Sequence, residues 1–189
     1  MAYYERRLPH WHPKGRDIFI TWRLEGTLPP NRYVPADGLT SGQAFTCVDR
    51  FLDKATYGPS WLRRREIAKL MVDALHYRET ELRHYVLHAY VVMPNHVHML
   101  ITPVIEVPRI MKSLKAFTGR AANLLLDRTG LPFWQREFYD HWVRDGEFER
   151  IARYIENNPV KAGLATEPHL FARSSAARRA AGLATGSPV

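Results

Sequence analysis

Two histidines separated by one residue carry the clearest chemical signal in this chain. His96 and His98 lie in the segment 90–103, which reads YVVMPNHVHMLITP. Residues i and i+2 of a β-strand point to the same face of a sheet, so the two imidazoles would project side by side. Histidine is the commonest metal ligand in proteins, so the pair predicts part of a divalent-metal site. Two ligands do not complete such a site, and other segments must supply the rest.

Tyr154 and Asn158 could complete it. They are four residues apart in a segment with helical apolar spacing, so they would share one helix face. If that face meets the histidines, Asn158 offers an oxygen ligand and Tyr154 places its hydroxyl beside the ion. A phenol in that position is a suitable nucleophile for a phosphodiester. Spacing alone leaves the alternative open that Tyr154 is a half-buried core residue and Asn158 an ordinary helix-terminal residue.

The elements that must position these residues follow from the apolar periodicity. We expect strands over 16–24, 85–93, 96–102 and 138–144. We expect helices from Ser41 to about 57, from Ser60 to about 83, over 107–126, and from Asp145 to 158, where Pro159 ends the last one. This order predicts an α+β fold in which helices pack on an antiparallel sheet.

Length and composition favour one domain. A chain of 189 residues with 46% hydrophobic and 24% charged residues is ordinary for a soluble globular protein. We expect the domain to span 1–171, with 1–15 as an irregular basic arm and 172–189 as a flexible tail without apolar periodicity. The chain has no run long enough for a membrane span, no apolar stretch like a signal peptide, and a single cysteine. We therefore expect a cytoplasmic protein that does not associate with membranes.

The charge indicates a polyanionic partner. The formal net charge is +8 and the pI is about 9.8, which favours nucleic acid. Basic side chains would contact the DNA backbone and an aromatic would stack on an unpaired base. The candidates are Arg6, Arg7, Trp11, Lys112, Lys115, Arg120, Arg136 and Lys161. The alternatives are a solvated basic surface and a Trp11 packed on the domain. For Trp134, core packing is the preferred interpretation.

Three separated stretches resemble one protein family. They read MPNHVHML at 93–100, FWQREFYDH at 133–141 and RIARYIENNPVKAG at 150–163. They resemble the REP-associated tyrosine transposases, a branch of the single-tyrosine HUH endonucleases. Residues 7–11 and 19–24 are also similar to that branch, so the resemblance spans about 5–170. The loop at 26–40 and the Arg-rich tail match no motif of the family.

The resemblance implies a ferredoxin-like fold, with His96, His98 and Asn158 as ligands of Mg²⁺ or Mn²⁺ and Tyr154 as the nucleophile. The implied activity is metal-dependent cleavage and transfer of single-stranded DNA at hairpin-forming repeated palindromes. It proceeds through a 5′-phosphotyrosine intermediate and needs no ATP. The resemblance also implies a bacterial, nucleoid-associated protein and favours a monomer over a dimer.

Two other functions remain open. The protein could be a non-cleaving regulatory protein that binds DNA hairpins. It could also be an unrelated His-x-His hydrolase that uses zinc, although that function leaves Tyr154 unexplained. The sequence does not identify a general base. Glu156 and His141 are guesses, and structural roles are the simpler interpretation for both.

Overall fold

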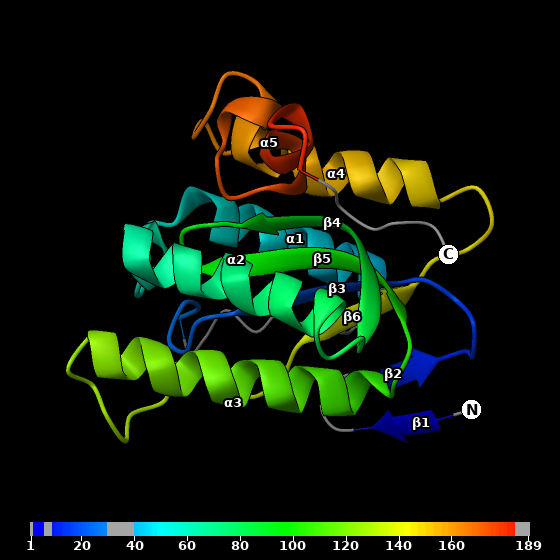
Figure 1. The fold of residues 1–189 in the computed structure, drawn as a ribbon, viewed down its shortest axis with the longest axis horizontal. Helices are drawn as coiled ribbons and strands as arrows, with labels where there is room; N and C mark the ends of the chain where they lie inside the picture. The colour runs from blue at the N-terminus through cyan, green and yellow to red at the C-terminus, as the bar shows by residue number, and fades with distance from the viewer. Residues whose placement is uncertain (1, 6–8, 30–39, 184–189) are drawn as a thin grey trace.

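A four-stranded antiparallel sheet forms the centre of the molecule (Figure 1). The computed structural model describes residues 2–5, 9–29 and 40–183. The strands lie in the order β4 (Tyr85–Val92), β5 (His96–Pro103), β3 (Ile18–Arg23), β6 (Tyr139–Trp142). Helix α2 (Arg65–Thr80) precedes β4, and α3 (Val107–Leu125) joins β5 to β6. This order confirms the predicted ferredoxin-like α+β fold.

The larger core lies between one face of the sheet and helices α2 and α3. Along β5, Val97, Met99 and Ile101 point into this core and are fully buried. Ile67, Met71, Leu75, Ile110, Met111 and Leu114 come from the two helices. Because strand side chains alternate, His96 and His98 must lie on the opposite face. The apolar half of β5 therefore fixes the direction in which its histidines point.

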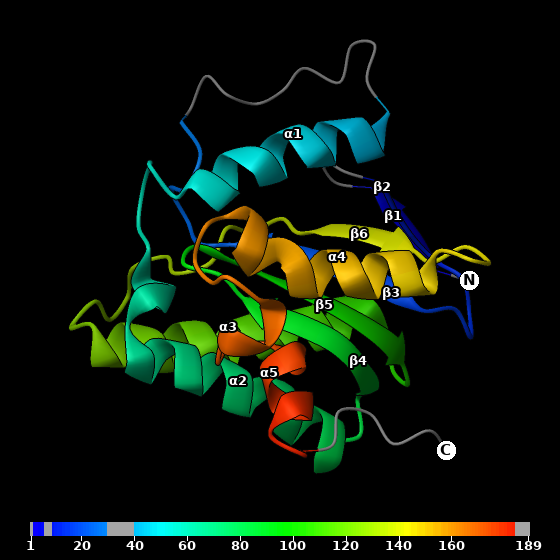
Figure 2. The same ribbon diagram turned by 90° about the horizontal axis from the view of Figure 1, so that it is seen from above.

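Helices α1 (Ser41–Lys54) and α4 (Phe148–Lys161) supply side chains to the histidine face. A smaller core forms there from Phe19, Leu100, Ile151 and Ile155, with Phe45 of α1 packed against it. Figure 2 shows α1 and α4 apart from the pair formed by α2 and α3. The helices that approach the histidines are thus additions to the ferredoxin-like unit.

The ends of helices α1 and α4 differ from the prediction. Thr40, not Ser41, caps α1, because its hydroxyl accepts a hydrogen bond from the Gln43 amide while the Gln43 side chain accepts one from the Thr40 amide. Glu147, not Asp145, occupies the N-cap position of α4. Pro159 does not end α4, which continues to Lys161. Backbone hydrogen bonds such as that from Ala162 to the Asn158 carbonyl persist beyond the proline.

The second predicted helix is also divided. A short 3-10 helix, η1 (Trp61–Arg63), comes first, and α2 begins at Arg65 after an extended Arg64. At the other end of the chain, the 3-10 helix η2 (Pro168–Leu170) follows α4.

Among the described residues, no helix has both the length and the apolar character needed to cross a membrane.

The prediction of a flexible tail over 172–189 is wrong for the residues that the structure describes there. Helix α5 (Ser175–Ala180) forms, and Ser174 and Ser175 are fully buried. The Val92 amide donates a hydrogen bond to the Arg173 carbonyl, so this segment extends the edge of the sheet at β4. Polar side chains and backbone groups make these contacts, which is why the apolar pattern did not reveal them. Residues 184–189 lie outside the described part.

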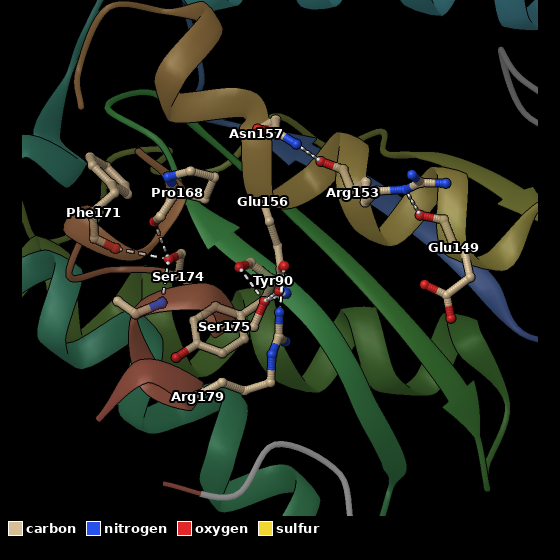
Figure 3. A network of polar contacts seen from close by, with 11 residues as sticks. Tyr90, Glu149, Arg153, Glu156, Asn157, Pro168, Phe171, Ser174, Ser175 and Arg179 are labelled. Atoms are coloured by element: carbon tan, nitrogen blue, oxygen red, sulfur yellow. Dashed lines mark hydrogen bonds and ion pairs between the residues drawn. The ribbon is translucent and has the colours of Figure 1, made fainter. Parts of the chain in front are cut away.

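Glu156 joins this C-terminal segment to α4, as Figure 3 shows. Its carboxylate accepts hydrogen bonds from the Ser175 hydroxyl at 2.5 Å and from the Arg179 guanidinium at 2.5 Å. The Ser175 hydroxyl oxygen also accepts a hydrogen bond from the Tyr90 amide of β4 at 3.1 Å. Helix α4, α5 and the edge strand are therefore fixed to one another by one polar network, which is buried at Ser175 and reaches the surface at Arg179.

The N-terminal arm is not irregular in its described part. Strands β1 (Ala2–Glu5) and β2 (Pro9–His12) pair antiparallel as a separate two-stranded sheet. Pro9 is compatible with this because it stands at the first position of its strand. His12 ties the sheet to the domain, since its Nε2 lies 2.7 Å from the Asp140 carboxylate on β6.

Candidate functional site

The two histidines direct the same ring nitrogen to one buried point. Both side chains are fully buried, and their Nε2 atoms are 3.0 Å apart. On the other side of each ring, His96 Nδ1 lies 2.7 Å from Asn95 Oδ1, and His98 Nδ1 lies 2.6 Å from Thr21 Oγ1. Partners of this kind fix the ring orientation and leave Nε2 available as a ligand. The prediction did not include Asn95 and Thr21.

Helix α1 adds a carboxylate that the sequence analysis missed. Asp49 is 3% exposed, and its Oδ1 lies 3.3 Å from His98 Nε2 and 3.8 Å from His96 Nε2. One ligand atom from each of these three residues lies within 4.8 Å of the others. A signal was present in the sequence, because Asp49 falls on the same helix face as Phe45 and Leu52. An acid within an apolar stripe is expected to have a buried partner.

Helix α4 brings the other two predicted residues to the same point. Asn158 is fully buried, and its Nδ2 lies 3.3 Å from His98 Nε2. The ring centroids of Tyr154 and His98 are 5.8 Å apart. The Tyr154 hydroxyl donates a hydrogen bond to Asp49 Oδ2. The structure therefore places His96, His98, Tyr154 and Asn158 together within one chain.

Burial sets the charge of these groups. It lowers the pKa of His96 to about 3, aided by His98, so the imidazole is neutral. Burial alone would raise the pKa of Asp49, but the two histidines and the Tyr154 hydrogen bond hold it well below its usual range. Burial and the Asp49 charge raise the pKa of Tyr154, which stays a neutral phenol. The same two causes raise the pKa of Asp53 to about 7.

These donors fit a divalent cation. Asp49 Oδ1 and Asn158 Oδ1 are buried and lack a hydrogen-bond partner among the described residues. Such buried oxygens are rare without a function. Asp49 Oδ1 adjoins the Nε2 atoms of both histidines, and the Asn158 amide adjoins His98 Nε2 through its Nδ2. Two neutral imidazoles with carboxylate and amide oxygens form a mixed set that can bind a hard divalent ion. Asp49, His96, His98 and Asn158 are thus the candidate ligands.

Lys161 is the one predicted DNA-contacting residue that the described structure brings to this site, with its Nζ 4.4 Å from the Tyr154 ring centroid. Lys112, Lys115 and Arg120 lie on α3, across the sheet from the histidines. Lys115 Nζ donates hydrogen bonds to the carbonyls of Gln135 and Arg136 at 2.6 and 2.8 Å, so it also holds the loop before β6.

The other sequence candidates are less closely tied to the site. Arg6, Arg7 and the side chain of Trp11 lie outside the described part of the chain. Trp134 packs in the core, as expected, and donates a hydrogen bond to the Thr118 hydroxyl. Glu156 binds α5, and His141 Nε2 lies 3.0 Å from Glu147, so both carry structural contacts.

Comparisons with known proteins identify a family and solved structures to which this chain is similar. The model of the family described as "Transposase IS200 like" matches residues 61–158, more than half of the chain. A solved REP-associated tyrosine transposase bound to a REP hairpin is 20% identical, with a TM-score of 0.58, and the match covers 100% of this chain and 99% of that one. A putative transposase from Deinococcus radiodurans R1 is 18% identical, covers 81% of this chain and 98% of its own, and has a TM-score of 0.42. No curated protein matches.

The matched segment contains the histidine strand and the part of α4 that carries the tyrosine and the asparagine. It begins after α1, so Asp49 lies outside it. The first structural relative has the same fold over its whole length, which agrees with the topology of the sheet. The chain belongs to the IS200-like transposase family, a class of DNA-processing enzymes.

Proposed function

We propose that this protein is a metal-dependent endonuclease and strand transferase for single-stranded DNA beside hairpin-forming repeats. One observation carries the proposal: the Tyr154 hydroxyl reaches the buried point at which Asp49 and the two histidines converge. Membership of a transposase family supports DNA as the substrate. The REP hairpin bound by the solved relative supports a folded hairpin as the substrate class.

Tyr154 is the nucleophile in this proposal. Its oxygen forms a bond to the phosphorus as the bond from phosphorus to the 3′-oxygen breaks. The products are a 5′-phosphotyrosine and a strand that ends in a 3′-hydroxyl. The departing 3′-oxygen takes up a proton from solvent to form that hydroxyl. Asp49 Oδ2 accepts the hydrogen bond of the phenol and so holds the phenolic oxygen at the site, and the phenolic proton passes to solvent during the attack.

The remaining residues prepare the phosphate. Mg²⁺ or Mn²⁺ held by Asp49, His96, His98 and Asn158 would neutralise negative charge on the phosphate oxygens. Asn95 hydrogen-bonds His96 and fixes its ring. Lys161 adds a positive charge beside the tyrosine ring. Such fixed charges stabilise the transition state without a cost of reorganisation.

Strand transfer is the reverse step with a new partner. A 3′-hydroxyl of another strand attacks the phosphotyrosine, and the tyrosine oxygen leaves. One phosphoester bond replaces another, so no ATP is needed. Because Tyr154 and the histidines meet within one chain, we propose a monomer that acts in cis. A substrate of this kind would place the protein at the bacterial nucleoid in the cytoplasm.

The test uses oligonucleotides with a hairpin and a short single-stranded flank, taken from palindromes near the coding sequence. With Mn²⁺, we expect a covalent protein–DNA adduct on a denaturing gel. Tyr154→Phe should abolish it, whereas Tyr77→Phe, at a tyrosine 54% exposed on α2, should not. Calorimetric Mn²⁺ titration of His96→Ala provides a readout independent of activity.

Persistence of the adduct in Tyr154→Phe would exclude the proposed nucleophile. Tight hairpin binding with no adduct and no effect of metal would instead favour a non-cleaving regulatory protein. Unchanged Mn²⁺ affinity in His96→Ala would remove the proposed metal site.

A further inference from the structure

A cavity of about 440 Å³ opens beside Tyr154, between α1, β6 and α4. Its volume is within the range of natural ligand sites. Phe19, Phe45 and Tyr139 line it together with the proposed nucleophile. The side formed by α1 lies before residue 61, outside the segment that matches the family. We call this cavity the flank pocket.

The rings in the flank pocket form one aromatic cluster. Phe45 and Tyr139 are stacked, with centroids 4.2 Å apart and planes at 20°. Phe19 packs edge-on against Phe45 at 5.5 Å and against Tyr154 at 6.0 Å. Both members of the stacked pair are only half-buried. A nucleic-acid base can extend a stacked pair of this kind, and any of the bases can do so because each has a flat aromatic face.

The mouth of the flank pocket is basic. Arg144 and Arg150 line it and are exposed. One carboxylate, Glu147, lies between them, but His141 at 3.0 Å and Arg150 at 2.7 Å both engage it. An aromatic interior with guanidinium groups at its edge matches a nucleotide, which joins a flat base to a phosphate.

We propose that the flank pocket binds one unpaired nucleotide next to the phosphate that Tyr154 attacks. The base extends the Phe45–Tyr139 stack, and its phosphate lies at Arg144 and Arg150. An unpaired nucleotide fits where a duplex does not, because the bases of a duplex are already stacked on their own neighbours. The proposal rests on the proposed function, since it places the scissile phosphate at Tyr154.

Gly42 offers a way to close the flank pocket without touching the catalytic residues. It lines the pocket from the first turn of α1, and a Cβ added there meets nothing within 4 Å. A larger side chain therefore enters open space. Gly42→Trp fills the pocket, whereas Cys47→Trp places the same side chain at an exposed position of the same helix that does not line it.

The experiment uses the full-length protein without metal and short single strands of random sequence, each with one 2-aminopurine base. Stacking on the aromatic pair should quench the fluorescence of this base in the wild type and in Cys47→Trp. Gly42→Trp and Tyr139→Ala should lose the quenching and bind the strand about tenfold more weakly. Equal quenching in all four proteins, or no quenching in the wild type, would overturn the proposal.

A second measurement does not depend on variants. Single strands that carry 5-iodouracil should photocrosslink to Phe45 or Tyr139 in the wild type, as read by mass spectrometry of the peptides. Crosslinks confined to other surfaces would overturn the proposal. Neither measurement needs cleavage. The absence of the Tyr154 adduct would refute the proposed chemistry, whereas quenching and crosslinks would still show whether the flank pocket binds a nucleotide.

Discussion

The Tyr154 hydroxyl on α4 donates a hydrogen bond to Asp49 Oδ2 on α1, across 105 positions of sequence. The other oxygen of the same carboxylate lies 3.3 Å from His98 Nε2. One buried acid thus contacts both the proposed nucleophile and the histidine pair. Since Asp49 precedes the segment that matches the family, this link depends on a helix that the family match does not include.

Asp49→Asn should weaken metal binding. The change keeps the shape of the side chain but replaces a charged oxygen ligand with a neutral amide, so we expect at least about a tenfold loss of Mn²⁺ affinity. Calorimetric titration measures it. Asp73→Asn is the control, because that carboxylate is 59% exposed and pairs with Lys69 on the surface of α2. Wild-type affinity in Asp49→Asn would show that this residue is not a ligand.

Asn95→Ala should affect both stability and metal binding. Asn95 Oδ1 lies 2.7 Å from His96 Nδ1, and its Nδ2 donates a hydrogen bond to the Leu52 carbonyl of α1 at 3.1 Å. Its loss leaves two buried groups unpaired, so the free energy of unfolding should fall by about 1–3 kcal/mol. Mn²⁺ affinity should fall roughly 10- to 100-fold.

Urea denaturation and metal titration check both effects. Asn157→Ala serves as the control, since among the described residues the Asn157 side chain donates a hydrogen bond only to the carbonyl of Arg153 within its own helix. If Asn95→Ala is as stable as the control and binds Mn²⁺ like the wild type, Asn95 does not orient His96.

The metal-free protein should show two opposing pH effects. Burial lowers the pKa of His96 from 6.5 to about 3, so between these values only the unfolded chain is protonated there, and stability falls as pH falls. Burial and Asp49 raise the pKa of Asp53 from 3.8 to about 7. In that window the folded chain holds the extra proton, so stability rises as pH falls.

Removing either His96 or Asp53 should leave the pH dependence of stability that the other residue causes. Asp53→Asn should lose stability as pH falls from about 6.5 towards 4, by up to about 1.4 kcal/mol per pH unit. His96→Gln should gain stability over the same range. Urea unfolding in the presence of a chelator measures both, and slopes of the same sign in the two variants would contradict the assignment.

Glu156→Gln should loosen the attachment of α4. The carboxylate of Glu156 binds Ser175 and Arg179, and the substitution removes its charge-assisted hydrogen bonds. We expect the free energy of unfolding to fall by about 1–3 kcal/mol. Thermal and urea unfolding measure the loss. Glu149→Gln, at an exposed glutamate of the same helix, should be near neutral. Equal stability of the two variants would mean that α5 does not hold α4 in place.

The sequence by itself determined the sheet and the half of the site that lies on regular elements. Strict alternation in β5 buries Val97 and Met99, and this forces His96 and His98 onto the other face. The four-residue spacing of Tyr154 and Asn158 places them on one face of α4 in the same way. Both inferences need only the geometry of a single element, and the structure shows these side chains together.

Only the tertiary structure decided what completes the site. Asp49 reaches His98 because α1 packs on the histidine face, and no local pattern fixes where a helix docks. Asn95 gained its role from a contact with α1, and residues 173–176 became ordered through polar contacts with β4 and Glu156. Hydrogen bonds between distant polar groups leave no periodic trace in a sequence. Apolar burial does leave one, which is why the sheet was predictable and the partners of its histidines were not.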